Sequence, residues 1–206
     1  QLLESAKLAV TGRKHEAIDV LNNLRNRHFG IAEELIRRTE NLDKAGKTID
    51  DIITKLASLV EGISLIGELT NRSLDMFAAQ GEWLSSAIIA AAMREAGLPA
   101  VWFDVRRVMI TDDRYASTVP DIPRLEINCA EHLMPRVSAD EIIVTQGFVG
   151  STSGGITTTL GRGGSDYSAA LLGAAMNAED IEIWTDVDGL LTTDPRIVPS
   201  AKRVNQ

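Results

Sequence analysis

The chain has 206 residues, a formal net charge of −8 at pH 7 and a sequence pI of about 4.9. This length allows one domain with a sizeable core, and the acidic balance argues against a nucleic-acid-binding surface. The apolar runs are too short to span a membrane, and the first residues do not resemble a signal or transit peptide. The single cysteine, Cys129, excludes internal disulfides, is expected to be a packed thiol and fits a cytoplasmic protein.

The first half of the chain has the apolar spacing of helices, with steps of three and four residues. The predicted helices span residues 16–36, 48–66, 73–79 and 83–95. The first of them has a slip near Gly30. Thr48 opens a segment similar to a capping box, and Ser73 is expected to cap the third helix. Gly81 is expected to interrupt the helical run before Trp83.

The second half alternates strand-like and helix-like segments. The predicted strands are 100–103, 141–145, 156–160 and 181–184, the predicted helices are 121–133 and 165–177, and 111–123 is expected to be irregular or edge structure. Strand, helix and strand between 156 and 184 predict a right-handed βαβ unit in a parallel sheet.

A glycine-rich turn lies between the strand and the helix of that unit, in the segment Thr159-Leu160-Gly161-Arg162-Gly163-Gly164-Ser165-Asp166-Tyr167. Backbone N–H groups and a helix N-terminus meet in such a turn, which suits an anion. Arg162 adds a guanidinium that can grip a carboxylate or phosphate. The turn is not a Walker loop, because no Gly-Lys-Ser/Thr follows. It is not a dinucleotide fingerprint either, because Asp166 stands where the third glycine belongs. A purely structural turn with Ser165 as the helix N-cap is the alternative.

A second polar segment, Trp184-Thr185-Asp186-Val187-Asp188-Gly189, follows the last predicted strand, and Thr193-Asp194-Pro195-Arg196 comes soon after it. Ligands of open α/β sheets bind beyond the carboxyl ends of parallel strands. Both polar loops are expected at that edge, one on each side of the helix 165–177. Asp194-Pro195 suits either a turn start or a functional role.

These motifs closely resemble those of aspartate kinases, which are members of the amino acid kinase family. The segments that carry the resemblance are Thr145-Gln146-Gly147-Phe148, Thr157 to Tyr167, Trp184 to Gly189, Gln80-Gly81-Glu82 and Trp102-Phe103-Asp104-Val105-Arg106. The resemblance implies a three-layer αβα sandwich of the amino acid kinase type, with a mainly parallel sheet and a helical insertion in the N-terminal half. Residues 1–97 would be the mainly helical part, and 98–206 the α/β part with the substrate and nucleotide loops.

The sequence also departs from the family pattern. The family's first strand, which ends in Lys-Phe/Tyr-Gly-Gly-Thr/Ser, and its Ser-Ala-containing loop are not found, nor are the later nucleotide lysine and the regulatory ACT domains. Leu191 stands where many members carry a tyrosine near the nucleotide. We therefore expect residues 1–206 to be a partial aspartate kinase catalytic domain that is inactive by itself.

By this resemblance, the full-length protein would transfer a phosphoryl group from ATP to the β-carboxylate of L-aspartate, giving 4-phospho-L-aspartate in the first step of lysine, threonine and methionine biosynthesis. The implied substrate residues are Glu82, Phe148, Arg162 and Ser165, the nucleotide residues are Gly163, Gly164, Thr185, Asp186 and Arg196, and the catalytic residue is Asp166. Mg²⁺ would be held mainly by the nucleotide phosphates, without a protein metal site. The full-length protein is expected to be a homo-oligomer.

Two other functions fit the sequence less well. One is another amino acid kinase, acting on glutamate, acetylglutamate or a nucleoside monophosphate, against which the long helical segment and Trp184-Thr185-Asp186 argue. The other is a non-catalytic ligand-binding or assembly module of the amino acid kinase fold.

Overall fold

The computed structural model describes residues 1–184, 189, 191–194, 197–202 and 204. Its first elements are the helices α1 (Leu2–Val10), α2 (Lys14–Leu35), α3 (Thr39–Ile66) and α4 (Asn71–Glu95). The elements that follow are β1 (Ala100–Trp102), the 3-10 helix η1 (Val105–Arg107), β2 (Ile110–Thr111), α5 (Ile122–His132), α6 (Met134–Val137), β3 (Ile142–Val144), β4 (Val149–Thr152), β5 (Thr157–Thr159) and α7 (Gly164–Ala175).

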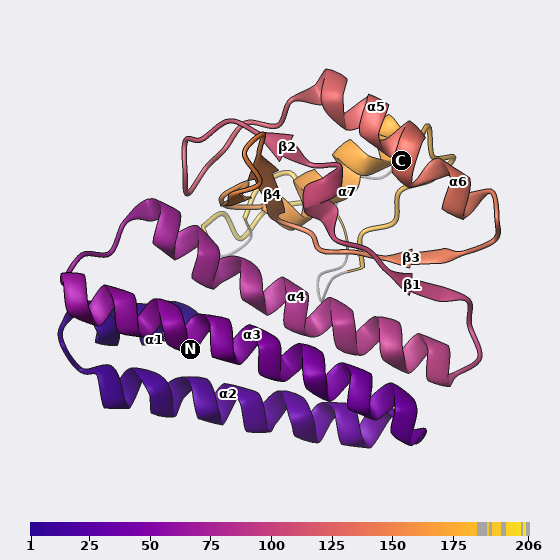
Figure 1. Ribbon diagram of the computed structural model, residues 1–206. Coiled ribbons are helices and arrows are strands. Elements are labelled where there is room, and N and C mark those ends of the chain that lie inside the picture. The colour runs from indigo at the N-terminus through magenta and orange to yellow at the C-terminus, as the bar shows by residue number, and fades with distance from the viewer. Residues whose placement is uncertain (185–188, 190, 195–196, 203, 205–206) are drawn as a thin grey trace.

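The strands lie between two groups of helices (Figure 1). Helix α4 packs against β1, β3 and β5, with α1 to α3 beyond it, whereas α5, α6 and α7 lie on the other side. β1 pairs with β3 and β2 pairs with β4, both in parallel, and β4 pairs with β5 in antiparallel fashion. This is the three-layer αβα arrangement with mainly parallel strands and an N-terminal helical insertion that the sequence predicted.

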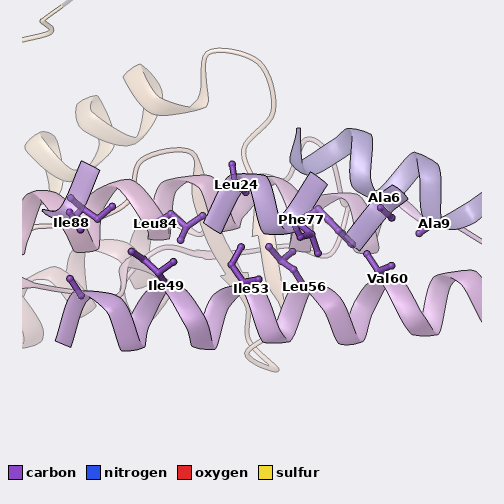
Figure 2. Close-up of a cluster of buried hydrophobic side chains, with 14 of the residues drawn as sticks. Ala6, Ala9, Leu24, Ile49, Ile53, Leu56, Val60, Phe77, Leu84 and Ile88 are labelled. Carbon is purple, nitrogen blue, oxygen red and sulfur yellow. The ribbon is translucent and has the colours of Figure 1, made fainter. Parts of the chain in front are cut away.

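The four N-terminal helices enclose an apolar core (Figure 2). The larger side chains in it are Leu21, Leu24, Ile49, Ile53, Leu56, Val60, Phe77, Leu84 and Ile88. Within each helix they recur at three-, four- or seven-residue steps, so they form one stripe that faces the neighbouring helices. Burial of these stripes, rather than helix propensity alone, holds the long helices together.

A second core lies between α4 and the α/β elements. Ala79 and Trp83 of α4 pack there together with Met109, Leu125 and Cys129. Cys129 is a free, fully buried thiol, and burial raises its pKa to about 11. The expected packed thiol is therefore confirmed, and α4 contributes to both cores of the molecule.

The expected break at Gly81 is wrong, because α4 runs through this residue without interruption. A glycine inside a helix costs about 1 kcal/mol relative to alanine. A Cβ at Gly81 would lie 3.4 Å from the Cδ1 of Leu2, an ordinary van der Waals distance, so α1 packs against this position without requiring a glycine. Buried residues on both sides of Gly81, among them Gln80 and Trp83, keep the helix continuous despite the poor local propensity.

Two predicted helix starts are also wrong. Thr48 lies inside α3, where its hydroxyl donates to the carbonyl of Lys44 at 3.0 Å instead of capping an N-terminus. The buried Ala45 and Ile49 show that packing extends the helix on both sides of this point. Helix α4 is capped by Thr70, whose hydroxyl oxygen accepts a bond from the N–H of Ser73 at 3.2 Å.

The predicted strand at 181–184 is not formed in the described part of the chain. Ile183 is 50% exposed and Trp184 is 90% exposed, although such residues favour strands by propensity. A strand requires a hydrogen-bonded partner, and residues 181–184 pair with no described strand, although β5 has a neighbour on one edge only. The parallel pairs of this fold therefore come from β1 with β3 and from β2 with β4, and not from the predicted βαβ unit.

The other predicted elements are confirmed within a few residues. They are the helices that became α2, α5 and α7 and the strands that became β1, β3 and β5. The helix predicted at 121–133 begins after Asp121, whose carboxylate accepts the N–H of Arg124 at 3.2 Å. Helices α1 and α6 and strands β2 and β4 were not predicted. None of the helices among the described residues has the length and apolar character that a membrane crossing requires.

Helix α3 offers a matched pair of leucines that tests the helical core. Leu56 is fully buried, whereas Leu65 is 88% exposed. We expect Leu56→Ala to lower the free energy of unfolding by about 2–5 kcal/mol, because it removes buried methyl groups and leaves a cavity. Leu65→Ala should change it by less than about 0.5 kcal/mol. Denaturant unfolding of the protein that carries this chain measures both, and equal effects would contradict the described packing.

Candidate functional site

The glycine-rich turn leads directly into α7 with free backbone donors. Gly161 and Gly163 have φ angles of 78° and 71°, which favour glycine. The helix N-cap is Gly163, so Ser165 lies in the first turn and is not the cap. Among the described residues, the N–H groups of Ser165 and Asp166 have no acceptor. These orphan donors and the positive end of the helix dipole form a site for an anion.

Phe148 is held against the start of α7 by its backbone. Its φ angle is 67°, which is unusual for a non-glycine residue. The N–H of Phe148 donates to the hydroxyl of Ser168 at 2.8 Å, and its carbonyl accepts the N–H of Leu160 at 2.9 Å. A Cβ at Gly164 would lie only 2.7 Å from the Phe148 ring. The loop before β4 and the glycine-rich turn are therefore packed directly on one another.

Ser165 belongs to the same contact. A Cβ placed on Gly147 would lie 3.3 Å from the Cα and the Cβ of Ser165. The structure thus brings together three of the residues predicted for the site, Phe148, Gly164 and Ser165. Gly164 is buried and its N–H donates to the carbonyl of Gly161 at 3.1 Å.

The charged groups of the turn are exposed and unpaired within the described part of the chain. The guanidinium of Arg162 and the carboxylate of Asp166 take part in none of the hydrogen bonds or ion pairs of the described residues, and both side chains are exposed. A long cation and a short acid next to free N–H groups can bind a ligand with both acceptor and donor groups.

Glu82 lies on α4 and is half-buried. No described residue donates to its carboxylate, and burial raises the pKa of this group. A desolvated carboxylate without a partner suits a cationic group of a ligand. No described contact joins Glu82 directly to Arg162, and the two are related through the packing of α4 on β5.

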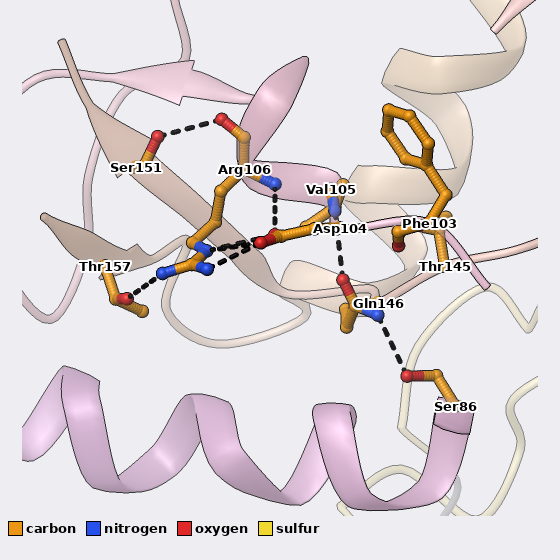
Figure 3. A network of polar contacts seen from close by, with 9 residues as sticks. All are labelled: Ser86, Phe103, Asp104, Val105, Arg106, Thr145, Gln146, Ser151 and Thr157. Atoms are coloured by element: carbon orange, nitrogen blue, oxygen red, sulfur yellow. Dashed lines mark hydrogen bonds and ion pairs between the residues drawn. The ribbon is translucent and has the colours of Figure 1, made fainter. Parts of the chain in front are cut away.

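A polar network fixes the segments that lead to Phe148 (Figure 3). The side chain of Gln146 is buried, accepts the N–H of Val105 at 3.0 Å and donates to the Ser86 hydroxyl at 2.9 Å. Trp102 donates its indole N–H to the same hydroxyl at 3.0 Å. Gln146 precedes Gly147-Phe148, so this network ties the Phe148 loop to α4.

The same network holds Arg106, which is not free for a ligand. Its guanidinium pairs with Asp104 at 2.5 Å, donates to Thr157 at 3.2 Å and lies 4.3 Å from the ring centroid of Trp83. Cation and carboxylate neutralise each other here, and the stacking orders the side chain. Arg106 is therefore a structural link between η1, β5 and α4.

Asp75 is a site-related residue that sequence reasoning missed. It is 2% exposed and accepts hydrogen bonds from the N–H of Ala116 and from both the N–H and the hydroxyl of Thr159. Its partners are 41 and 84 residues away in the sequence, so no local pattern points to them. The one available signal is that Asp75 precedes Glu82 by seven residues, which places both on one face of a helix.

The nucleotide part of the predicted site is only partly covered. Thr185, Asp186 and Arg196 lie outside the described residues. Among the described residues, no group of three or more His, Cys, Asp and Glu side chains could hold a metal ion. The described half of the predicted site therefore comprises Glu82, the Phe148 loop and the start of α7.

The raised pKa of Glu82 leads to a pH-dependent stability prediction. A carboxyl whose pKa is raised on folding stabilises the folded state at pH values below its unfolded pKa. This contribution is lost as the pH rises through the folded pKa. We therefore expect Glu82→Gln to raise the thermal midpoint at neutral pH, with a gain that shrinks as the pH falls toward about 4. The exposed Glu126→Gln is the control, and a destabilised Glu82→Gln protein at neutral pH would contradict the prediction.

Comparison with known proteins gives one consistent result. Residues 10–206 match the model of the amino acid kinase family. The lysine-sensitive aspartokinase 3 of Escherichia coli K12 is 42% identical over 196 residues, which are 95% of this chain and 41% of that protein. The aspartokinase of Pseudomonas aeruginosa is 32% identical and is matched by 86% of this chain, over 44% of its own length.

Solved structures agree with this match. E. coli aspartokinase III in complex with aspartate and ADP has a TM-score of 0.82 and 38% identity, over 98% of this chain and 44% of that one. The aspartate kinase of Clostridium acetobutylicum has a TM-score of 0.64 and 27% identity, and the match covers 98% of this chain and 41% of that one. The chain spans less than half the length of these relatives. Because the family model covers nearly all of its residues, the chain belongs to the amino acid kinase family.

Proposed function

We propose that the protein carrying this chain is an aspartate kinase, which transfers the γ-phosphoryl group of ATP to the β-carboxylate of L-aspartate and forms 4-phospho-L-aspartate. This reaction would open the biosynthesis of lysine, threonine and methionine. The observation that carries the proposal is the likeness of 98% of the chain to an aspartokinase III that was solved with aspartate and ADP. The 206 residues would then form part of the catalytic domain.

The described half of the site is assigned to the amino acid substrate. Arg162 would bind the α-carboxylate of aspartate through a two-pronged contact, for which its exposed and unpaired guanidinium is suited. Glu82 would pair with the ammonium group, which compensates a carboxylate that is already desolvated. Phe148 and Ser165 would shape the space between them, since both are packed at the start of α7.

The proposed phosphoryl transfer requires little acid–base catalysis. The nucleophile is a carboxylate that is ionised at neutral pH, so no general base is needed. Two anions must instead be brought together, and the developing charge on the transferred group must be stabilised. The free N–H groups at the start of α7 supply part of that stabilisation. Asp166, in the first turn of α7, would orient cationic groups around the phosphates.

The nucleotide is assigned to Gly163, Gly164, Thr185, Asp186 and Arg196. Mg²⁺ would arrive on the phosphates of ATP and keep most of its ligands from phosphate and water. When bound, Mg²⁺ would neutralise phosphate charge. The chain's own part is to orient the phosphates at the turn of Gly163, whose left-handed φ of 71° aims the following backbone toward them.

The direct test is an ATP-dependent hydroxamate assay for acyl phosphate with the protein that carries this chain. We expect turnover with L-aspartate, and none with L-glutamate or N-acetylglutamate at equal concentrations. Turnover with either of the last two would replace aspartate as the substrate. Binding of aspartate and ATP without turnover would favour a non-catalytic module of this fold.

Replacing Arg162 should affect aspartate far more than ATP. We expect Arg162→Ala to lower kcat/KM for aspartate by about 30-fold or more, because loss of a charged partner leaves a carboxylate unpaired at a cost of about 2–4 kcal/mol. Arg162→Lys keeps the charge without the fork and should be intermediate. Steady-state kinetics with each substrate varied in turn decides this. An unchanged kcat/KM for aspartate in Arg162→Ala would mean that the side chain plays no part in substrate binding.

Asp186 should have the opposite selectivity. We expect Asp186→Ala to weaken ATP binding by about tenfold, as typical for one lost charge-assisted hydrogen bond, and to leave aspartate recognition nearly intact. Calorimetric titration of ATP measures the first effect and the KM for aspartate the second. Asp180→Ala serves as the control, because Asp180 is an exposed acid that lies near Asp186 in the sequence. Equal ATP affinity of Asp186→Ala and the parent protein would overturn the assignment.

A further inference from the structure

We propose that Asp75 and Ser86 are positioning residues that clamp α4 at two points and thereby hold Glu82 in place relative to the two loops of the aspartate site. The inference rests on the proposed function in one respect: Glu82 is taken as the partner of the substrate ammonium. The clamp itself is a matter of geometry. Asp75, Glu82 and Ser86 are separated by seven and four residues, so they lie on one face of the helix.

The first point of the clamp ties α4 to the end of β5. Asp75 accepts the N–H of Thr159 at 3.0 Å and its hydroxyl at 2.7 Å. Thr159 is also fixed from its other side, because its carbonyl accepts the N–H and the hydroxyl of Thr118 at 3.1 and 2.9 Å. The chain reaches Arg162 three residues later, so the base of the glycine-rich turn is held where Asp75 puts it.

Asp75 reaches the turn by a second route. It accepts the N–H of Ala116 at 3.0 Å, in a loop where Ala116 has a φ of 74°. The carbonyl of Ala116 lies against the turn, since a Cβ on Gly161 would be 3.0 Å from it. One buried carboxylate therefore organises β5 and the loop that supports Gly161. All three of its partners are donors, which a carboxylate can satisfy and an amide cannot.

The second point of the clamp ties α4 to the Phe148 loop. The hydroxyl of Ser86, which is 5% exposed, accepts bonds from Gln146 at 2.9 Å and from Trp102 at 3.0 Å. Gln146 is bonded in turn to the N–H of Val105 and stands two residues before Phe148. Glu82 lies between these two points, with about one turn of helix to Ser86 and about two turns to Asp75.

This arrangement makes a specific kinetic prediction. The distance between the carboxylate of Glu82, which would bind the substrate ammonium, and the turn of Arg162, which would bind the substrate carboxylate, depends on the clamp. Displacement of about 1 Å at such a site costs up to about 100-fold in rate. Loosening the clamp should therefore raise the aspartate KM. The ATP KM should change little when the Ser86 point is loosened, because that point leads only to the Phe148 loop, and more when the Asp75 point is loosened, because that point also supports the turn of Gly163 and Gly164.

Two variants loosen the clamp and two matched variants do not. Asp75→Asn replaces one acceptor oxygen by an NH₂ donor, which then faces the donors of Thr159 and Ala116. Ser86→Ala removes the acceptor shared by Gln146 and Trp102. Thr158→Val is the control for the first, because Thr158 is equally buried in β5 and loses its bond to Thr111 without touching Asp75. Ser5→Ala is the control for the second, because Ser5 is fully buried and donates to the carbonyl of Ala17, outside both points of the clamp.

We expect both clamp variants to raise the aspartate KM by about tenfold or more, with both controls near the parent in each constant. Ser86→Ala should leave the ATP KM within about twofold, whereas Asp75→Asn should raise the ATP KM as well, by a smaller factor than the aspartate KM. If Asp75→Asn fails to fold, Thr159→Val removes only one bond of the same point and should give a smaller shift in the same direction. Clamp variants that lower only the thermal midpoint, or that change both KM values as the controls do, would overturn the proposal.

A readout without turnover separates the clamp from the function. Hydrogen exchange of the backbone amides of residues 159–166 should quicken in Asp75→Asn, and that of 146–149 in Ser86→Ala, with neither change in the controls. If the parent protein does not turn over aspartate, the proposed function fails and exchange alone decides the clamp. If turnover is as expected but exchange at both loops is unchanged, the clamp fails and the proposed function stands.

Discussion

Helix α4 buries two faces, and most of the structure depends on that constraint. One face carries Phe77, Leu84 and Ile88 into the helical core, and the other carries Ala79 and Trp83 into the α/β core. A helix with one apolar stripe can shift or rotate on its support, whereas a helix gripped on two sides has one permitted register. The position of the strands relative to the helical bundle is therefore fixed along α4. Any residue on the face toward the strands inherits that fixed position.

The polar groups on α4 follow from the same constraint. A buried acceptor is tolerated only where donors reach it, and Asp75 and Ser86 are both satisfied by distant residues. Trp83 is the exception, because its indole N–H is buried without a partner among the described residues. Its ring stacks with the guanidinium of Arg106 at 4.3 Å, a contact that stabilises the ring but supplies no acceptor for the N–H. Polar satisfaction thus selects where along the helix the strands can attach.

The sequence predicts well those elements that depend on residues close together in the chain. The helices that became α2 and α5 follow from apolar spacing and, for α5, from the cap at Asp121. The glycine-rich turn at the start of α7 follows from residues that lie next to each other. The sequence predicts poorly wherever a distant contact overrides local preference. Thr48 lies inside α3 because the buried Ala45 and Ile49 extend the helix past it, and the 181–184 segment forms no strand although its residues favour one.

The same division holds within the site. Arg162, Ser165 and Asp166 stand out in the sequence because they cluster in one turn. The hydroxyl of Ser168, which holds the Phe148 backbone, and the carboxylate of Asp75 do not stand out, because their partners are 20 and 84 residues away. Nothing local distinguishes such residues from ordinary members of a helix. Supporting residues are therefore the part of a site that composition and spacing miss.

The negative net charge of the chain opposes the binding of anionic substrates. A protein with a net charge of −8 repels anions at long range, yet the proposed reaction joins a carboxylate to a triphosphate. Attraction must then be local. The N–H groups of Ser165 and Asp166 are uncommitted, and Arg162 has no described acidic partner, whereas Arg106 is already neutralised by Asp104. Arg162 is thus an unpaired cation beside the helix N-terminus, where its field and that of the helix dipole add.

Glu82 completes this electrostatic arrangement from the other side. Its half-burial makes the ionised form costly, as the raised pKa shows, and nothing described in the chain relieves that cost. A ligand ammonium would relieve it, so under the proposed function part of the binding selectivity would come from this unfavourable carboxylate. An anion without an ammonium group would leave Glu82 uncompensated and would also meet a like charge. If Arg162 binds the ligand carboxylate and Glu82 the ligand ammonium, as proposed, the two would favour a zwitterion over a simple dicarboxylate.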